Sequence, residues 1–138
     1  MKLAILAIGK PGRGPEATLA ADYAERATLA GRALGLGPMD LVDLEPRKTG
    51  KAPEAELILK AAEGAHLIAC DERGRTFGSR AFADHVAELR DRGERRLVFA
   101  IGGADGLDRS VLDAAASTLA FGPQTWPHAL ARAMLAEQ

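Results

Sequence analysis

The chain has 138 residues and a formal net charge of −1. This length fits one domain that can bury a core without disulfides. The near-zero charge excludes a strongly basic nucleic-acid binder, although a local basic patch remains possible. The single cysteine, Cys70, excludes an intramolecular disulfide framework and favours a reducing, cytoplasmic location.

The N-terminal residues 2–8 form a short apolar run that predicts a buried first strand and is too short to span a membrane. A loop rich in glycine and proline follows over residues 9–15. Pro15 suits the first turn of a helix and Gly35 suits a helix end, so a helix is expected over residues 16–34.

The middle of the chain continues with a second strand over residues 39–44 and a polar, basic loop over residues 45–51. A helix is expected over residues 53–63, because Gly64 then ends it. The apolar run 66–71 predicts the third strand.

The last part of the chain repeats this alternation, and Asp108 is a good N-cap for a helix after Gly106. The elements expected here are a helix from Ser79 or Gly78 to about Gly93, a strand over residues 96–101, the helix after Asp108, a strand over residues 118–122 and a helix from Pro127.

Strands and helices therefore alternate along the whole chain, and the strands show no alternation of polar and apolar residues. This pattern predicts an α/β fold with a mostly parallel sheet that has helices on both faces. Such sheets bind small molecules at the carboxyl ends of their strands. We therefore look for a site in the loops that follow the strands.

The glycine-rich turn over residues 102–106 follows the fourth predicted strand. Its spacing is not the G-x-G-x-x-G of a dinucleotide-binding fingerprint. Glycines allow close approach of a ligand to the backbone, but a tight strand-to-helix turn explains them equally well.

The first loop, residues 9–15, could cradle a phosphate. Because neither Ser nor Thr follows Lys10, an ordinary surface loop is the favoured interpretation there.

The chain offers little for metal or thiol chemistry. His66, His85 and His128 are far apart and show no ligand spacing, so no metal site is expected. Cys70 has no base nearby in the sequence and is expected to be a small buried residue rather than a nucleophile. Asp71, beside it, could face a pocket or cap the next loop.

His128 and Arg132 are four residues apart in the last predicted helix and therefore share a face. The helix dipole favours a neutral imidazole at His128, in the first turn. Arg132 could bind an anion such as a phosphate through two N–H groups of its guanidinium. A solvated helix face would explain the same spacing.

The residues IGGADGL at 101–107, FGPQTWPHALAR at 121–132 and LAEQ at 135–138 together resemble the RlmH (YbeA-type) family of SPOUT-class methyltransferases. The start of the chain and Cys70-Asp71 fit the same family, and the resemblance covers essentially the whole chain in order. Each motif by itself is unspecific, but the pair at this separation is specific.

The resemblance implies methylation of N3 of a pseudouridine in 23S ribosomal RNA on the assembled ribosome. It implies a C-terminal trefoil knot that holds S-adenosyl-L-methionine, whereas an unknotted sheet would be the default without it. A cytoplasmic homodimer is implied as well. His128 and Arg132 are the catalytic candidates, either for the N3 proton or for the RNA backbone. The cofactor-binding residues it implies are Cys70, Gly102, Gly103, Phe121, Gly122, Pro123, Gln124, Thr125 and Trp126.

The chain departs from the family pattern at three places. Cys70 stands where the family usually has Leu, and residues 121–125 replace a Leu-Ser-x-x-Thr pattern. Family members also continue past Glu137-Gln138 with a C-terminal tail. We therefore expect one SPOUT domain over residues 1–138 without that tail, through truncation or by nature.

RNA binding needs positive charge near the site. The basic residues expected at the carboxyl edge of the sheet are Lys10, Arg13, Arg47, Lys48, Lys51, Arg73, Arg75 and Arg80. Two alternatives to the enzyme are a non-catalytic nucleotide- or RNA-binding knot domain and a flavodoxin-like domain that binds phosphate at residues 9–15.

Overall fold

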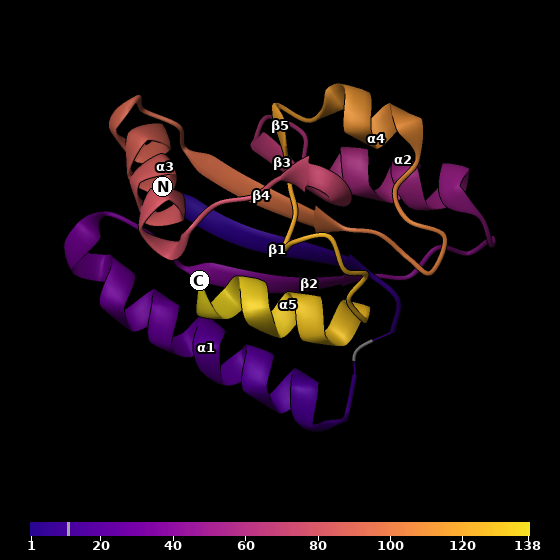
Figure 1. Cartoon of the computed structure of the whole chain (residues 1–138), viewed down its shortest axis with the longest axis horizontal. Coiled ribbons are helices and arrows are strands. Elements are labelled where there is room, and N and C mark those ends of the chain that lie inside the picture. Colours follow the sequence, from indigo (N-terminus) through magenta and orange to yellow (C-terminus); the bar gives the residue numbers. More distant parts are fainter. Residues whose placement is uncertain (11) are drawn as a thin grey trace.

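The computed structural model describes residues 1–10 and 12–138. Its strands form one parallel sheet of five strands in the order β2-β1-β4-β3-β5, as Figure 1 shows. The elements are β1 (Lys2–Ile8), α1 (Pro15–Gly31), the 3₁₀ helix η1 (Arg32–Leu34), β2 (Met39–Leu44), α2 (Lys51–Ala61), β3 (His66–Arg75), α3 (Ser79–Asp91), β4 (Arg96–Ile101), α4 (Arg109–Ala114), β5 (Ser117–Leu119) and α5 (His128–Glu137).

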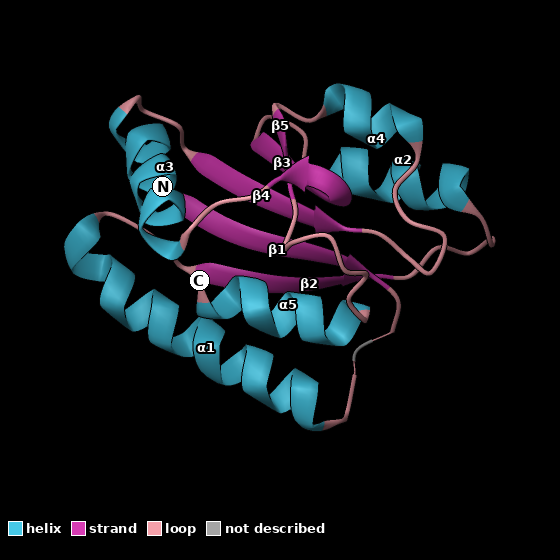
Figure 2. Cartoon of the chain, in the orientation of Figure 1, coloured by secondary structure: helices cyan, strands magenta, loops and turns pink. Residues whose placement is uncertain are grey.

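Helices cover both faces of the sheet, as the sequence predicted (Figure 2). One core cluster contains Phe82 of α3 and Leu135 of α5 beside alternate residues of β1. The opposite cluster contains Ile58 of α2 and Val111 of α4. β4 lies between β1 and β3 with both faces covered, which explains its run of buried apolar residues.

Several sequence predictions are confirmed to the residue. β1, β2 and β4 have the predicted bounds, and Asp108 caps α4 by accepting a hydrogen bond from the backbone N–H of Ser110 at 2.9 Å. The long first helix ends in η1, and Gly35 then adopts a left-handed conformation with φ of 68°.

Other predicted bounds are wrong. β3 continues to Arg75, and β5 ends at Leu119 instead of residue 122. The chain leaves the sheet there and turns at Gly122, whose φ of 102° lies outside the range of a strand. α2 begins at Lys51, which shortens the basic loop, and Pro127 is the N-cap of α5 rather than its first residue.

The parallel sheet brings the loops after β1, β3 and β4 to one edge, together with the segment that joins β5 to α5 (Figure 1). The suggested phosphate loop 9–15 contains Pro11, which lies outside the described residues. Among the described helices, none combines the length and the apolar character needed to cross a bilayer.

Candidate functional site

A cleft of about 770 Å³ opens at this edge of the sheet. Its walls are the end of β3 with residues 71–73, the turn over residues 101–107, and the segment from Thr118 to Trp126. Of the predicted cofactor-binding residues, all but Pro123 line this cleft. Pro123 faces a second hollow instead. Segments far apart in the sequence are thus brought together where the sequence predicts the site.

The glycine turn is folded tightly upon itself. The backbone N–H of Gly106 donates to the carbonyl oxygen of Gly103 at 3.0 Å. A Cβ atom on Gly102 would lie 2.7 Å from the carbonyl carbon of Gly106, and one on Gly103 would lie 2.8 Å from Oε1 of Glu54. Contacts below 3 Å are not tolerated, so a side chain at residue 102 would force the turn apart. The turn therefore presents bare backbone to the cleft.

Two side-chain hydrogen bonds hold the loop over residues 121–126. The indole Nε1–H of Trp126 donates to the carbonyl oxygen of Phe121 at 3.3 Å. The hydroxyl of Thr125 donates to Oε2 of Glu72 at 3.1 Å. Glu72 lines the cleft and was missed by the sequence analysis, although its position just after Asp71 at the end of a predicted strand could have identified it.

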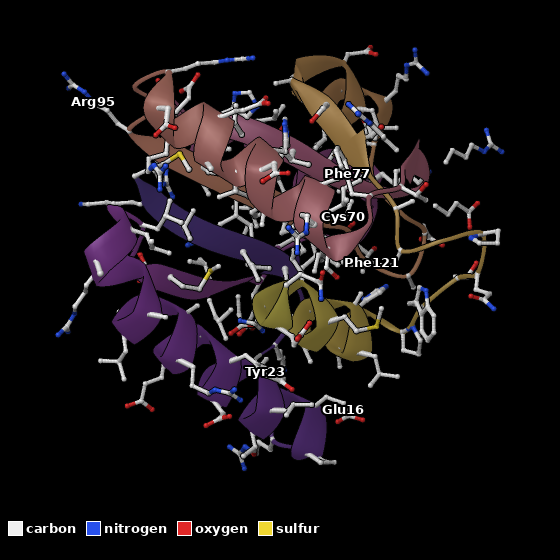
Figure 3. All side chains as sticks on the ribbon, turned by 60° about the vertical axis from the view of Figure 1, so that its left-hand side comes forward. Glu16, Tyr23, Cys70, Phe77, Arg95 and Phe121 are labelled. Atoms are coloured by element: carbon white, nitrogen blue, oxygen red, sulfur yellow. The ribbon has the colours of Figure 1, made fainter. Side chains whose placement is uncertain are left out.

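Cys70 gives the cleft a neutral wall. It packs with Phe121 against the core cluster that also contains Leu135, and both Cys70 and Phe121 are labelled in Figure 3. Burial raises the pKa of the Cys70 thiol to about 12. Since the thiolate is the reactive form, this raised pKa disfavours Cys70 as a nucleophile at neutral pH. The residue is half-buried, whereas the sequence predicted a fully buried one.

His128 and Arg132 have different surroundings although they share a helix. His128 is the first residue of α5 and lines the cleft. Arg132 is only 14% exposed and makes an ion pair with Asp43 of β2 through both terminal nitrogens. Arg132 is not among the residues that line the cleft. The structure therefore brings only His128 to the candidate site.

The predicted basic residues also differ in whether they line the cleft. Lys51 and Arg73, both predicted, line the cleft together with Arg109, which was not predicted. The guanidinium of Arg75 lies 4.4 Å from the ring centre of Phe77. The other predicted basic residues, all of them exposed, are Lys10, Arg13, Arg47, Lys48 and Arg80.

Within the described part of the chain, no group of three His, Cys, Asp or Glu side chains is arranged to hold a metal ion.

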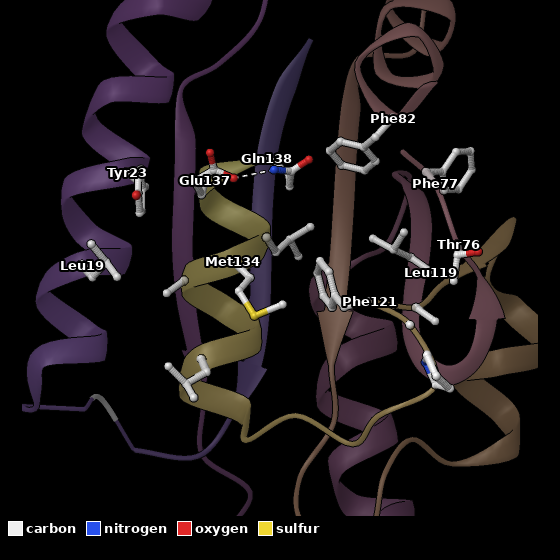
Figure 4. A pocket seen from close by; sticks show the side chains of 16 residues that line it. Leu19, Tyr23, Thr76, Phe77, Phe82, Leu119, Phe121, Met134, Glu137 and Gln138 are labelled. Atoms are coloured by element: carbon white, nitrogen blue, oxygen red, sulfur yellow. Dashed lines mark hydrogen bonds between the residues drawn. The ribbon is translucent and has the colours of Figure 1, made fainter. Parts of the chain in front are cut away.

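An apolar groove of about 730 Å³ lies between α1 and α5 and reaches α3. Figure 4 shows Leu19 and Tyr23 of α1 on one side, Met134 of α5 in the middle, and Phe82 and Phe121 on the other side. Phe121 lines both the groove and the cleft, so the two hollows are adjacent.

Comparison with known proteins gives consistent matches. The family described as "Predicted SPOUT methyltransferase" matches residues 1–138. The chain is 65% identical to "Ribosomal RNA large subunit methyltransferase H" of Caulobacter vibrioides, over all of this chain and 89% of that protein. It is 62% identical to the protein of the same name from Phenylobacterium zucineum, over all of this chain and 90% of that protein. Among solved structures, it is similar to the SpoU methyltransferase AviRb from Streptomyces viridochromogenes in complex with AdoMet. That match has a TM-score of 0.44 and 15% identity, over 98% of this chain and 55% of the other.

The ion pair between Arg132 and Asp43 gives a prediction about stability. Asp43→Asn keeps the side-chain volume but leaves the mostly buried guanidinium without a charged partner. We expect the free energy of unfolding to fall by about 2 kcal/mol, measured by urea denaturation. Asp40→Asn is the matched control, because Asp40 is an exposed aspartate on the same strand. Equal stability of the two variants would contradict the prediction.

Proposed function

The chain belongs to the SPOUT methyltransferase family, and we propose that it methylates N3 of a pseudouridine in 23S ribosomal RNA. Relatives at 65% and 62% identity carry the name of a ribosomal RNA large subunit methyltransferase. The observation that carries the proposal is the cleft, because it gathers the end of β3, the glycine turn and the loop over residues 121–126. These are the segments to which the family resemblance assigns the cofactor.

The residues of the cleft fit S-adenosyl-L-methionine. A volume of about 770 Å³ is in the range of small-molecule sites. Phe121 and Trp126 offer apolar surface for an adenine ring, and Gly102 brings backbone to the wall of the cleft. Asp71 places a carboxylate where a cation would be favoured. When bound, the cofactor supplies a methyl group on a positively charged sulfur atom.

The chain's own contribution to the reaction is alignment, exclusion of water and removal of a proton. N3 of pseudouridine carries a hydrogen that has to leave when the methyl group is added, so a proton acceptor is needed. We propose His128 for this role, because it lines the cleft at the start of α5. Arg132 is held by Asp43, and we propose that it anchors α5 to β2.

Recognition of the ribosomal RNA is proposed to use the basic side chains at the cleft. Lys51, Arg73 and Arg109 line it from α2, the end of β3, and α4. Contacts from such side chains to phosphates fix the register and orientation of a nucleic acid. The near-neutral net charge fits an enzyme that recognises the assembled ribosome by its shape.

We also propose that the chain acts as a cytoplasmic homodimer with the family's trefoil knot. The apolar groove between α1 and α5 supports the dimer, since Leu19 and Leu130 line it while 45% and 39% exposed. Its proximity to the cleft would let a second copy border the site.

Cofactor binding tests the proposed site. We expect Gly102→Ala to weaken S-adenosyl-L-methionine binding about tenfold or more and Gly102→Val to abolish it, measured by titration calorimetry. The added Cβ would meet the backbone of Gly106 and distort the turn. Gly78→Ala is the control, since a Cβ at Gly78 meets no atom within 4 Å. Unchanged binding by the Gly102 variants would move the site elsewhere.

Substitution of His128 tests the proton acceptor. We expect His128→Asn to lower kcat about 100-fold or more, with little change in KM for ribosomes that lack the modification. Transfer of a labelled methyl group is the measurement. A raised KM with unchanged kcat would assign His128 to RNA binding instead.

The dimer gives a third expectation. Leu130→Glu places a charge in the apolar groove and should convert the dimer to a monomer, measured by light scattering during gel filtration. Leu34→Glu is the control, because Leu34 is 57% exposed and lies outside the groove. A monomeric parent chain, or an unchanged Leu130→Glu dimer, would argue against this interface.

A further inference from the structure

The end of β3 carries an irregularity in its pairing with β5. Cys70 and Arg75 of β3 both pair with Leu119 of β5, so residues 71–74 leave the sheet between them. Gly74 makes this possible, since a Cβ there would lie 2.6 Å from the carbonyl carbon of Leu119. Oδ1 of Asp71 accepts a hydrogen bond from the backbone N–H of Arg73 at 3.2 Å. These contacts fix the excursion over residues 71–74, and Glu72 lies within it.

From this excursion, the Glu72 carboxylate reaches the loop that precedes α5. It accepts the hydroxyl hydrogen of Thr125 at 3.1 Å, and the two residues are 53 positions apart in the sequence. Both line the cleft. Among the described residues, the hydrogen bonds of the loop over residues 121–126 are this one and the bond from the Trp126 indole to Phe121. Apart from the Phe121 carbonyl, the backbone groups of this loop make no hydrogen bond within the described part of the chain, so its position depends on side-chain contacts.

We propose that Glu72 is a positioning residue, which sets the loop over residues 121–126 in the conformation that binds S-adenosyl-L-methionine. This inference rests on the proposed function, since it concerns the same cleft. A loop that is already held in place loses less conformational entropy when a ligand binds, so affinity rises without any new contact to the ligand. Glu72 acts through Thr125.

The charge of Glu72 is a competing explanation for any effect of this residue on cofactor affinity, because a carboxylate in the cleft attracts a cationic ligand directly. The two explanations differ for Glu72→Gln. The glutamine amide oxygen can still accept the Thr125 hydroxyl, but it carries no charge. Positioning therefore predicts that the glutamine variant keeps its affinity, whereas direct attraction predicts that it loses as much as Glu72→Ala.

The experiment combines titration calorimetry with a double-mutant cycle. We expect Glu72→Ala and Thr125→Val each to raise the Kd for S-adenosyl-L-methionine about fivefold, and the double variant to add little more. Glu72→Gln should stay within about twofold of the parent chain. Glu56→Ala is the control, since Glu56 is an exposed glutamate on α2, outside the cleft. Additive losses, or a glutamine variant as weak as the alanine variant, would overturn the proposal.

A second readout needs no cofactor. Trp126 is the single tryptophan of the chain, lies in the loop concerned and is 38% exposed. Loss of the Glu72 bridge should raise acrylamide quenching of its fluorescence in the cofactor-free protein, while Glu56→Ala should leave quenching unchanged. Equal quenching in Glu72→Ala and the parent chain would overturn the proposal. If the parent chain fails to bind the cofactor, the proposed function fails, and the quenching result still decides the role of Glu72.

Discussion

The parallel pairing of β4 between β1 and β3 is the constraint on which the rest of this structure depends. β4 is buried on both faces, and its partners fix its register along its whole length. Because the strands run in one direction, the end of β4 at Ile101 lies beside Cys70 of β3. The glycine turn and residues 71–73 are therefore neighbours, and the cleft follows from the pairing of the strands.

One wall of the cleft is a glycine turn that contributes backbone in place of side chains. Gly102 and Gly103 pack so closely against Gly106 and Glu54 that no side chain fits at either position without displacement. A wall of bare backbone offers no side chains that could form hydrogen bonds with the neighbouring loops. This explains why the side-chain bridges of Thr125 and Trp126 matter for the loop that completes the wall.

α5 contributes residues to both the cleft and the apolar groove. Its first residue, His128, faces the cleft, while Met134 and Leu130 line the apolar groove toward α1. The ion pair of Arg132 with Asp43 fixes the helix between these surfaces. A shift of α5 would therefore change the cleft and the groove together, which is how assembly of two copies and methyl transfer would be coupled in the proposed dimer.

The sequence by itself determined the alternation of strands and helices, the bounds of β1, β2 and β4, and the cap at Asp108. These features depend on short-range patterns, such as an apolar run that glycine or proline ends. The family resemblance, and not such patterns, indicated the cofactor residues, of which all but Pro123 line one cleft. Only the tertiary structure decided the partner of Arg132, which is 89 positions away, the early end of β5, and the bridge from Glu72 to Thr125. Such contacts depend on which distant segments the sheet brings together, and residue spacing along the chain carries no record of that.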